Sequence, residues 1–166
     1  EEGQGSTFRI RLPLTLAILD GQLVRISDQI YIIPLVSIVE SIQIQEQFLN
    51  TLPGKGELYR VREDYIPIIR LDDVFNLSHE VKELAQGLLV VVEAENQKAG
   101  IFVDDLLGQQ QVVIKSLETN YKSVEGISGA TILGDGTVAM ILDVSGTLHL
   151  TRNNLNSHIE AGYKAA

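Results

Sequence analysis

The segment GLLVVVEAENQKAGIFVDDLLG, residues 87–108, contains two strand-like runs separated by a polar loop. Val and Ile fill much of both runs, and β-branched residues are favoured in strands. The loop expected between them, Glu93 to Lys98, is too short for a crossover helix, so the two strands must be antiparallel. This segment therefore predicts a β-hairpin.

Three further segments repeat this plan of strand, turn and strand. We expect their turns at 27–29, near Glu63 and Asp64, and at Gly134-Asp135-Gly136, where glycine supplies positive φ angles. Residues 109–117 are a further strand candidate. Many short strands at hairpin spacing predict an all-β fold. The three segments are LVRISDQIYIIPL (23–35), ELYRVREDYIPIIRL (57–71) and ATILGDGTVAMILDVS (130–145).

Helix signals are few. We expect one turn within 34–42, opened by Pro34, another at 71–76, and a short helix near 153–160. The polar segment NLSHEVKELAQG, 76–87, lies between two hairpin-rich halves of similar plan. It predicts a seam between two small β lobes.

Composition narrows the function. The chain of 166 residues is 45% hydrophobic, which argues against a disordered tail, and its net charge is −9. This acidity argues against binding of nucleic acid or of anionic lipid surfaces. Cysteine is absent, no apolar run approaches the ~18 residues that span a bilayer, and we see no secretion signal. We therefore expect a cytoplasmic protein.

We find no constellation of catalytic or metal-binding residues. The three histidines stand apart in the sequence, and the acidic pairs 72–73 and 104–105 are expected to close strands with solubilising charge. Gly3 and Gly5 could cradle a phosphate, but no helix follows to offer its N-terminus to an anion. We predict a binding module with no catalytic and no metal site. The histidines are His79, His149 and His158.

Two leucines occupy the polar side of their strands. Alternation places Leu23 on one face with Arg25, and Leu58 on one face with Arg60. Single exposed apolar residues are common. Since two of them fall on strands of the same predicted lobe, we expect Leu23 and Leu58 to form the centre of a partner-binding surface.

Long, ordered motifs carry a resemblance to a known family. The chain resembles the C-terminal part of the chemotaxis histidine kinases of the CheA family, from about Gly3 to Ser145. The motifs are GSTFRIRLPLTLAILDG, YIIPL, YIPIIRL, VDDLLGQQQVVIKSLETNY and GISGATILGDGTVAMILDVS.

This resemblance implies a fold and a division of the chain. The fold would be two intertwined SH3-like β-barrels with a few short helical turns, as in the coupling protein CheW. Residues 1–13 would be the last strand of the kinase's ATP-binding domain, 14–20 a link, 21–150 the CheW-like regulatory domain and 151–166 a tail. Only a remnant of the nucleotide motif would remain, at Gly3, Gly5, Ser6 and Thr7.

The resemblance also implies partners. Such a domain would bind a CheW-type coupling protein, the cytoplasmic tips of chemoreceptors and other CheA domains, within receptor arrays at the membrane. ATP and Mg would belong to the full-length kinase, because its nucleotide-holding motifs are absent here, and we expect no cofactor. The alternatives are a stand-alone CheW-like coupling protein, disfavoured by GSTFRIRLP, a residual kinase fragment, and an OB-like barrel for nucleic acid, disfavoured by charge.

Overall fold

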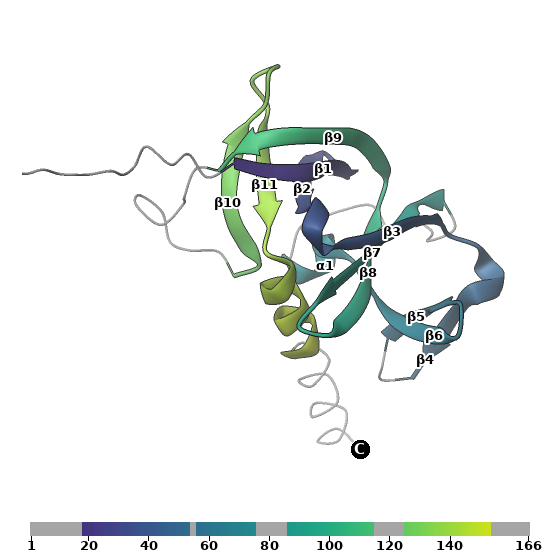
Figure 1. Ribbon diagram of the computed structural model, residues 1–166. Coiled ribbons are helices and arrows are strands. Elements are labelled where there is room, and N and C mark those ends of the chain that lie inside the picture. The colour runs from purple at the N-terminus through teal and green to yellow at the C-terminus, as the bar shows by residue number, and fades with distance from the viewer. Residues whose placement is uncertain (1–17, 54–55, 76–85, 115–124, 154–166) are drawn as a thin grey trace, which may run out of the picture.

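The computed structural model describes residues 18–53, 56–75, 86–114 and 125–153, and it folds into two β-sheets (Figure 1). The first sheet has five strands in the order β10-β11-β2-β1-β9, and the second has six in the order β3-β7-β8-β6-β5-β4. The strands are β1 (Ile18–Ile26), β2 (Gln29–Pro34), β3 (Ile38–Gln43), β4 (Leu49–Leu52), β5 (Gly56–Val61), β6 (Asp64–Ile69), β7 (Leu88–Ala94), β8 (Gln97–Val103), β9 (Asp105–Val113), β10 (Ile127–Ile132) and β11 (Val138–Leu142).

Each sheet curls around its own apolar cluster, and a third cluster lies between the two sheets. Leu23, Ile32 and Ile141 belong to the cluster inside the first sheet, and Tyr59 and Ile66 to the cluster inside the second. The third cluster takes residues from both sheets and is the largest. The predicted all-β fold of two barrels is confirmed. The shared cluster is built mainly from Val24, Ile26, Tyr31, Ile33, Ile69, Leu71, Val90, Val92, Ile101, Val103 and Leu142.

The predicted seam at 76–87 does not separate the sheets. Strands β7 and β8, which follow it, join β3 and β6, which precede it, in one ladder. The chain instead leaves the first sheet after β2 and returns to it at β9, so the second sheet is inserted within the first. The prediction was wrong because two similar hairpin sets look alike in sequence whether they are tandem or nested.

Two short parallel ladders complete the sheets. β11 pairs with β2 over three residue pairs and β6 pairs with β8 over two, whereas the other pairs are antiparallel. In each case the second strand of one hairpin meets the second strand of another. These parallel contacts join segments far apart in the chain, and hairpin spacing alone does not reveal them.

Two glycines allow the barrels to curve. A Cβ on Gly100 would lie 2.6 Å from Leu89 Cδ1, and one on Gly21 would collide with the Ile32 side chain. Each large side chain therefore lies flat over the backbone of a neighbouring strand. Glycine inside a strand often marks such a close approach.

The hairpin turns are tighter than predicted. Positive φ angles occur at Ser27, Arg62, Glu95 and Asn96, and β7 and β8 extend to within two residues of each other. At the β10–β11 turn the predicted positive φ occurs at Gly136 (86°), while Gly134 is not among the positive-φ residues.

Short helical turns lie between strands or just after them. They are η3 (Leu35–Ser37), which Pro34 precedes, η4 (Glu46–Phe48) and α1 (Leu71–Val74). A longer helix occupies residues 144–153, so the C-terminal helix begins nine residues earlier than predicted, and positions 154–160 of the predicted helix lie outside the described residues. The Asp143 carboxylate accepts the backbone N–H of Gly146 at 3.2 Å, which caps this helix.

The predicted boundaries near the N-terminus need one correction. β1 already begins at Ile18, where Ile18 pairs with Val113 of β9, so 18–20 belong to the domain rather than to a link. The predicted ATP-domain strand at 1–13, with Gly3, Gly5, Ser6 and Thr7, lies outside the described residues.

Leu23 is buried, so its predicted exposure was wrong. Its side chain is 7% exposed and packs inside the first barrel with Ile32 and Val112, while its neighbour Val24 is 0% exposed on the opposite face. The middle of strand β1, residues 21–24, is therefore covered on both faces. A strand buried on both faces shows no alternation between a wet and a dry side.

This placement predicts the effect of truncation. Leu23→Ala should lower the free energy of unfolding by about 2–5 kcal/mol, because it leaves a cavity in a closed cluster. Leu107→Ala serves as the control, since Leu107 is 43% exposed and should cost far less. Chemical denaturation measures both values, and equal small losses would contradict the burial of Leu23.

Candidate partner interface

One face of the three-stranded ribbon β4–β5–β6 carries apolar side chains that are uncovered among the described residues, beside the polar side chains of Asn50 and Arg60. Residues directly opposite in a ladder share a face, and Leu58 lies opposite both Asn50 and Pro67. Alternation adds Leu52 and Tyr65 to the same face, and these two are 41% and 56% exposed. We define the β4–β6 face as Leu52, Leu58, Tyr65 and Pro67.

The opposite face of the ribbon explains why this one is left outside. Leu49, Tyr59 and Ile66 point into the second barrel. The Tyr59 hydroxyl accepts the backbone N–H of Gln45 at 3.2 Å, and its ring meets Phe48 edge-on with centroids 6.1 Å apart. The ribbon is thus fixed from within, and its outer apolar side chains are presented on a rigid support.

Charged side chains lie both on the β4–β6 face and on the other side of its strands. Arg60 stands opposite Tyr65 on the face itself, whereas Glu57 alternates with Leu58 onto the inner side. Arg70 Nε lies 3.3 Å from Glu57 Oε2, and Arg62 reaches across to Glu40 of β3 at 3.6 Å. Exposed Arg60 donates from Nε to the Arg62 carbonyl at 3.0 Å. An apolar centre with a polar rim is the usual layout of a protein–protein interface.

The two leucines selected from the sequence do not lie on one surface. Leu58 is half-buried on the β4–β6 face, whereas Leu23 lies inside the other barrel. Leu52, Tyr65 and Pro67 were missed. Tyr65 and Pro67 alternate with buried Ile66 in the sequence, which is a usable signal, but Leu52 joins them only through the strand register.

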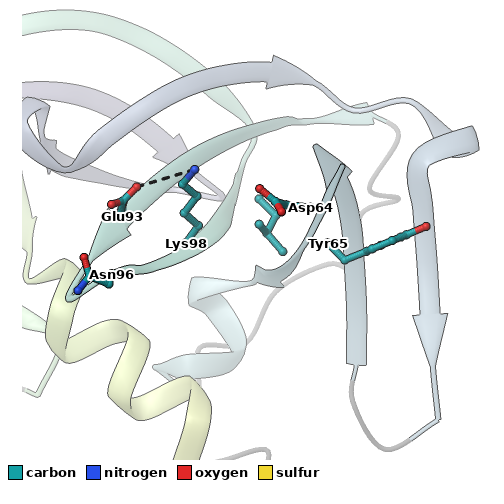
Figure 2. A pocket seen from close by; sticks show the side chains of 6 residues that line it. Asp64, Tyr65, Glu93, Asn96 and Lys98 are labelled. Atoms are coloured by element: carbon teal, nitrogen blue, oxygen red, sulfur yellow. Dashed lines mark ion pairs between the residues drawn. The ribbon is translucent and has the colours of Figure 1, made fainter. Parts of the chain in front are cut away.

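A shallow open hollow lies beside this ribbon, with a volume of about 400 Å³. Asp64 and the Glu93–Lys98 ion pair, with N and O 4.0 Å apart, supply its charges, and Asn96 adds a neutral amide. Figure 2 shows the Tyr65 side chain pointing away from Glu93 and Lys98, toward the other side of the ribbon. Tyr65 nevertheless lines part of the hollow, so the hollow and the β4–β6 face adjoin at this residue.

The acidic pairs hold a turn in place. Asp104 Oδ2 accepts the backbone N–H of Ser27 at 2.7 Å, and Asp72 Oδ2 accepts the Ser27 hydroxyl at 3.3 Å. Asp105 pairs with Arg25 at 3.6 Å. Burial, and then the nearby Asp72 charge, raises the pKa of the Tyr31 phenol. These carboxylates anchor the positive-φ turn at Ser27, a role beyond the solubilising one predicted.

The described residues hold no cluster of three or more His, Asp or Glu side chains placed to bind a metal ion. His149 contacts Glu95 on the surface, and His79 and His158 lie outside the described residues. None of the helices in the described ranges is long and apolar enough to cross a membrane.

The sequence of this chain matches the CheW-like domain family over residues 20–152. The chain belongs to the CheW-like domain family. Its fold agrees: it is similar to a crystal structure of the scaffolding protein TtCheW from Thermoanaerobacter tengcongensis, with a TM-score of 0.64, 16% identity, and coverage of 75% of this chain and 88% of that one.

Curated relatives with this CheW-like domain are much longer proteins. The chain is 46% identical over 152 residues to "Chemotaxis protein CheA" of Salmonella typhimurium, covering 92% of this chain and 23% of that protein. It is 37% identical over 153 residues to "Sensor histidine kinase CheAY" of Helicobacter pylori, covering 92% and 19%. The predicted resemblance to CheA is confirmed, and the region shared is the CheW-like domain.

If the β4–β6 face is a true surface, a charge placed on it should be tolerated by the fold. Leu58→Asp should lower the free energy of unfolding by only about 1 kcal/mol, because a carboxylate at a half-exposed strand position keeps its contact with water. Thermal melting followed by circular dichroism measures this. Global unfolding at room temperature would mean that Leu58 is a core residue.

Proposed function

We propose that this chain is the regulatory domain of a CheA-type chemotaxis histidine kinase, which binds a CheW-type coupling protein and chemoreceptor signalling tips. Through these contacts it passes the state of the receptors to the kinase. It acts in the cytoplasm, at receptor arrays on the membrane, and inserts into no membrane itself. Other CheA domains are its further partners.

The observation that carries the proposal is the uncovered β4–β6 face. Monomeric proteins rarely leave a contiguous apolar patch with a polar rim unless it binds something. Leu58 lies on the middle strand of the ribbon with Tyr65 toward its hairpin end, and the side chains on its inner face hold it rigid. A preorganised apolar surface loses little freedom on binding, so more of the contact energy contributes to affinity.

A second candidate function is that of a stand-alone CheW-like coupling protein, which would use the same β4–β6 face to bind its partners. The structural likeness to a CheW scaffold supports that reading. The sequence identity to CheA proteins is higher than that to this scaffold, at 46% for the CheA of Salmonella typhimurium. This difference favours the regulatory domain of a CheA-type kinase.

Binding should depend on the β4–β6 face. Leu58→Asp should weaken binding of a CheW-type protein by about 30-fold or more, equivalent to about 2 kcal/mol, because complex formation would bury an unpaired carboxylate. Leu107→Asp is the matched control, since it places the same charge on an exposed leucine of the other barrel. Calorimetry measures both affinities at two salt concentrations, and the wild-type affinity should fall only modestly with salt. Equal affinity for Leu58→Asp and wild type would place the interface elsewhere.

We also propose that the chain binds no nucleotide by itself. The acidic Asp-x-Gly-x-Gly and the Asn motif that would hold Mg-ATP in the kinase are missing from this sequence. Titration with Mg-ATP should give no saturable heat. Micromolar binding would support the residual kinase reading instead.

A further inference from the structure

The C-terminal helix presents one polar face to the turn between β7 and β8. Ser145, His149 and Arg152 are spaced four and three residues apart, so they line one side of helix 144–153. Ser145 Oγ donates to Glu95 Oε1 at 2.8 Å, and His149 Nε2 lies 3.0 Å from Glu95 Oε2. The Arg152 guanidinium donates to the side-chain oxygen of Gln97. Both oxygens of one carboxylate are thus engaged by one helix.

The turn that carries Glu95 is a rigid support. Glu95 and Asn96 have φ angles of 52° and 62°, which suit a tight two-residue hairpin turn. The β7–β8 ladder runs unbroken from Leu88 opposite Val103 to Ala94 opposite Gln97. The helix therefore contacts the tip of the central hairpin of the second sheet, although it follows directly from β11 of the first (Figure 1).

The two halves of the helix are held differently. The first half is anchored by the core, because Val144 and Leu148 are buried in the shared cluster and Thr147 Oγ1 donates to the Asp143 carbonyl at 2.8 Å. Beyond Leu148 no described side chain of the helix is fully buried. There Leu150 is half-buried beside Gly126, and His149 and Arg152 add polar contacts with the hairpin turn.

We propose that these contacts form a latch, defined as Ser145, His149 and Arg152 on the helix with Glu95 and Gln97 on the turn. The latch holds the second half of the helix against the hairpin. It can open while both barrels stay folded, because the core residues that hold the sheets together take no part in it. Opening frees residues 149–153 to fray and uncovers the edge of Leu148.

The charge of Glu95 sets the strength of the latch. The hydrogen bond from Ser145, followed by that from His149, lowers the pKa of the Glu95 carboxyl. The charged groups that face it from the helix are His149 and Arg152, and on its own hairpin Glu93 is paired with Lys98. A lowered pKa means that the stabilisation is present above the pKa of the unfolded chain and is lost as the pH falls through the folded value.

The test is hydrogen exchange on the intact chain. Glu95→Ala should lower the protection factors of amides 149–153 at least threefold and leave those of β1, β7 and β8 unchanged. Glu93→Ala is the matched control. It removes a carboxylate from the same hairpin, but one that pairs with Lys98 of that hairpin. It should leave the helix unchanged. Unchanged protection in Glu95→Ala, or equal losses in β7 and β8, would overturn the proposal.

A second variant tests the latch from the helix side. His149→Ala should also lower protection of 149–153, and adding it to Glu95→Ala should cause little further loss, because both remove the same contact. Fully additive losses would mean that the two residues act separately, and the latch would not exist. At a pH low enough to protonate Glu95, wild type and Glu95→Gln should become alike. A persistent difference would contradict the role of the charge.

Discussion

Burial of both faces of the β7–β8 hairpin is the constraint on which the structure depends. Val90 and Ile101 point into the cluster shared by the two sheets, while Leu89 and Phe102 point into the second barrel. Gly100 lets Leu89 lie against the backbone, so the hairpin can curve between the two clusters. A polar substitution on either face would leave an unsatisfied group in an apolar interior.

The ribbon β4–β5–β6 has one exposed face because the β7–β8 hairpin already lies between the two apolar clusters. Apart from Ile69 at the end of β6, which reaches the shared cluster, β4, β5 and β6 cover only the cluster inside the second barrel, so Tyr59 and Ile66 point inward and Leu58 and Tyr65 remain outside. The first sheet has no such one-sided ribbon at β1, which is enclosed by its own barrel and by the shared core. The two barrels therefore differ in exposure: a strand with an apolar cluster on each face is buried, and a strand with a cluster on one face leaves the other face exposed.

Leu23 and Leu58 show how far the sequence could predict the site. Both occur in the pattern Leu-x-Arg before a two-residue turn, and local alternation treats them alike. The hairpins, most turns and the family resemblance were predictable, because they depend on short-range pattern or on long motifs. Which face of each strand is buried was not predictable from the sequence. Burial of Leu23, for example, depends on Val112 and Ile141, which lie about 90 or more residues away along the chain. The insertion of the second sheet within the first was not predicted for the same reason: it depends on pairing between strands far apart in the chain.

The insertion of one sheet within the other has a consequence for folding order. The second sheet uses one continuous stretch, 38–103, so even its longest-range ladder, β3 with β7, closes a shorter loop than the ladders that close the first sheet. The first sheet cannot close until β9 and β11 return to β1 and β2 across that stretch, which gives it the higher contact order. We therefore expect the inserted sheet to form first and the first sheet to close over it.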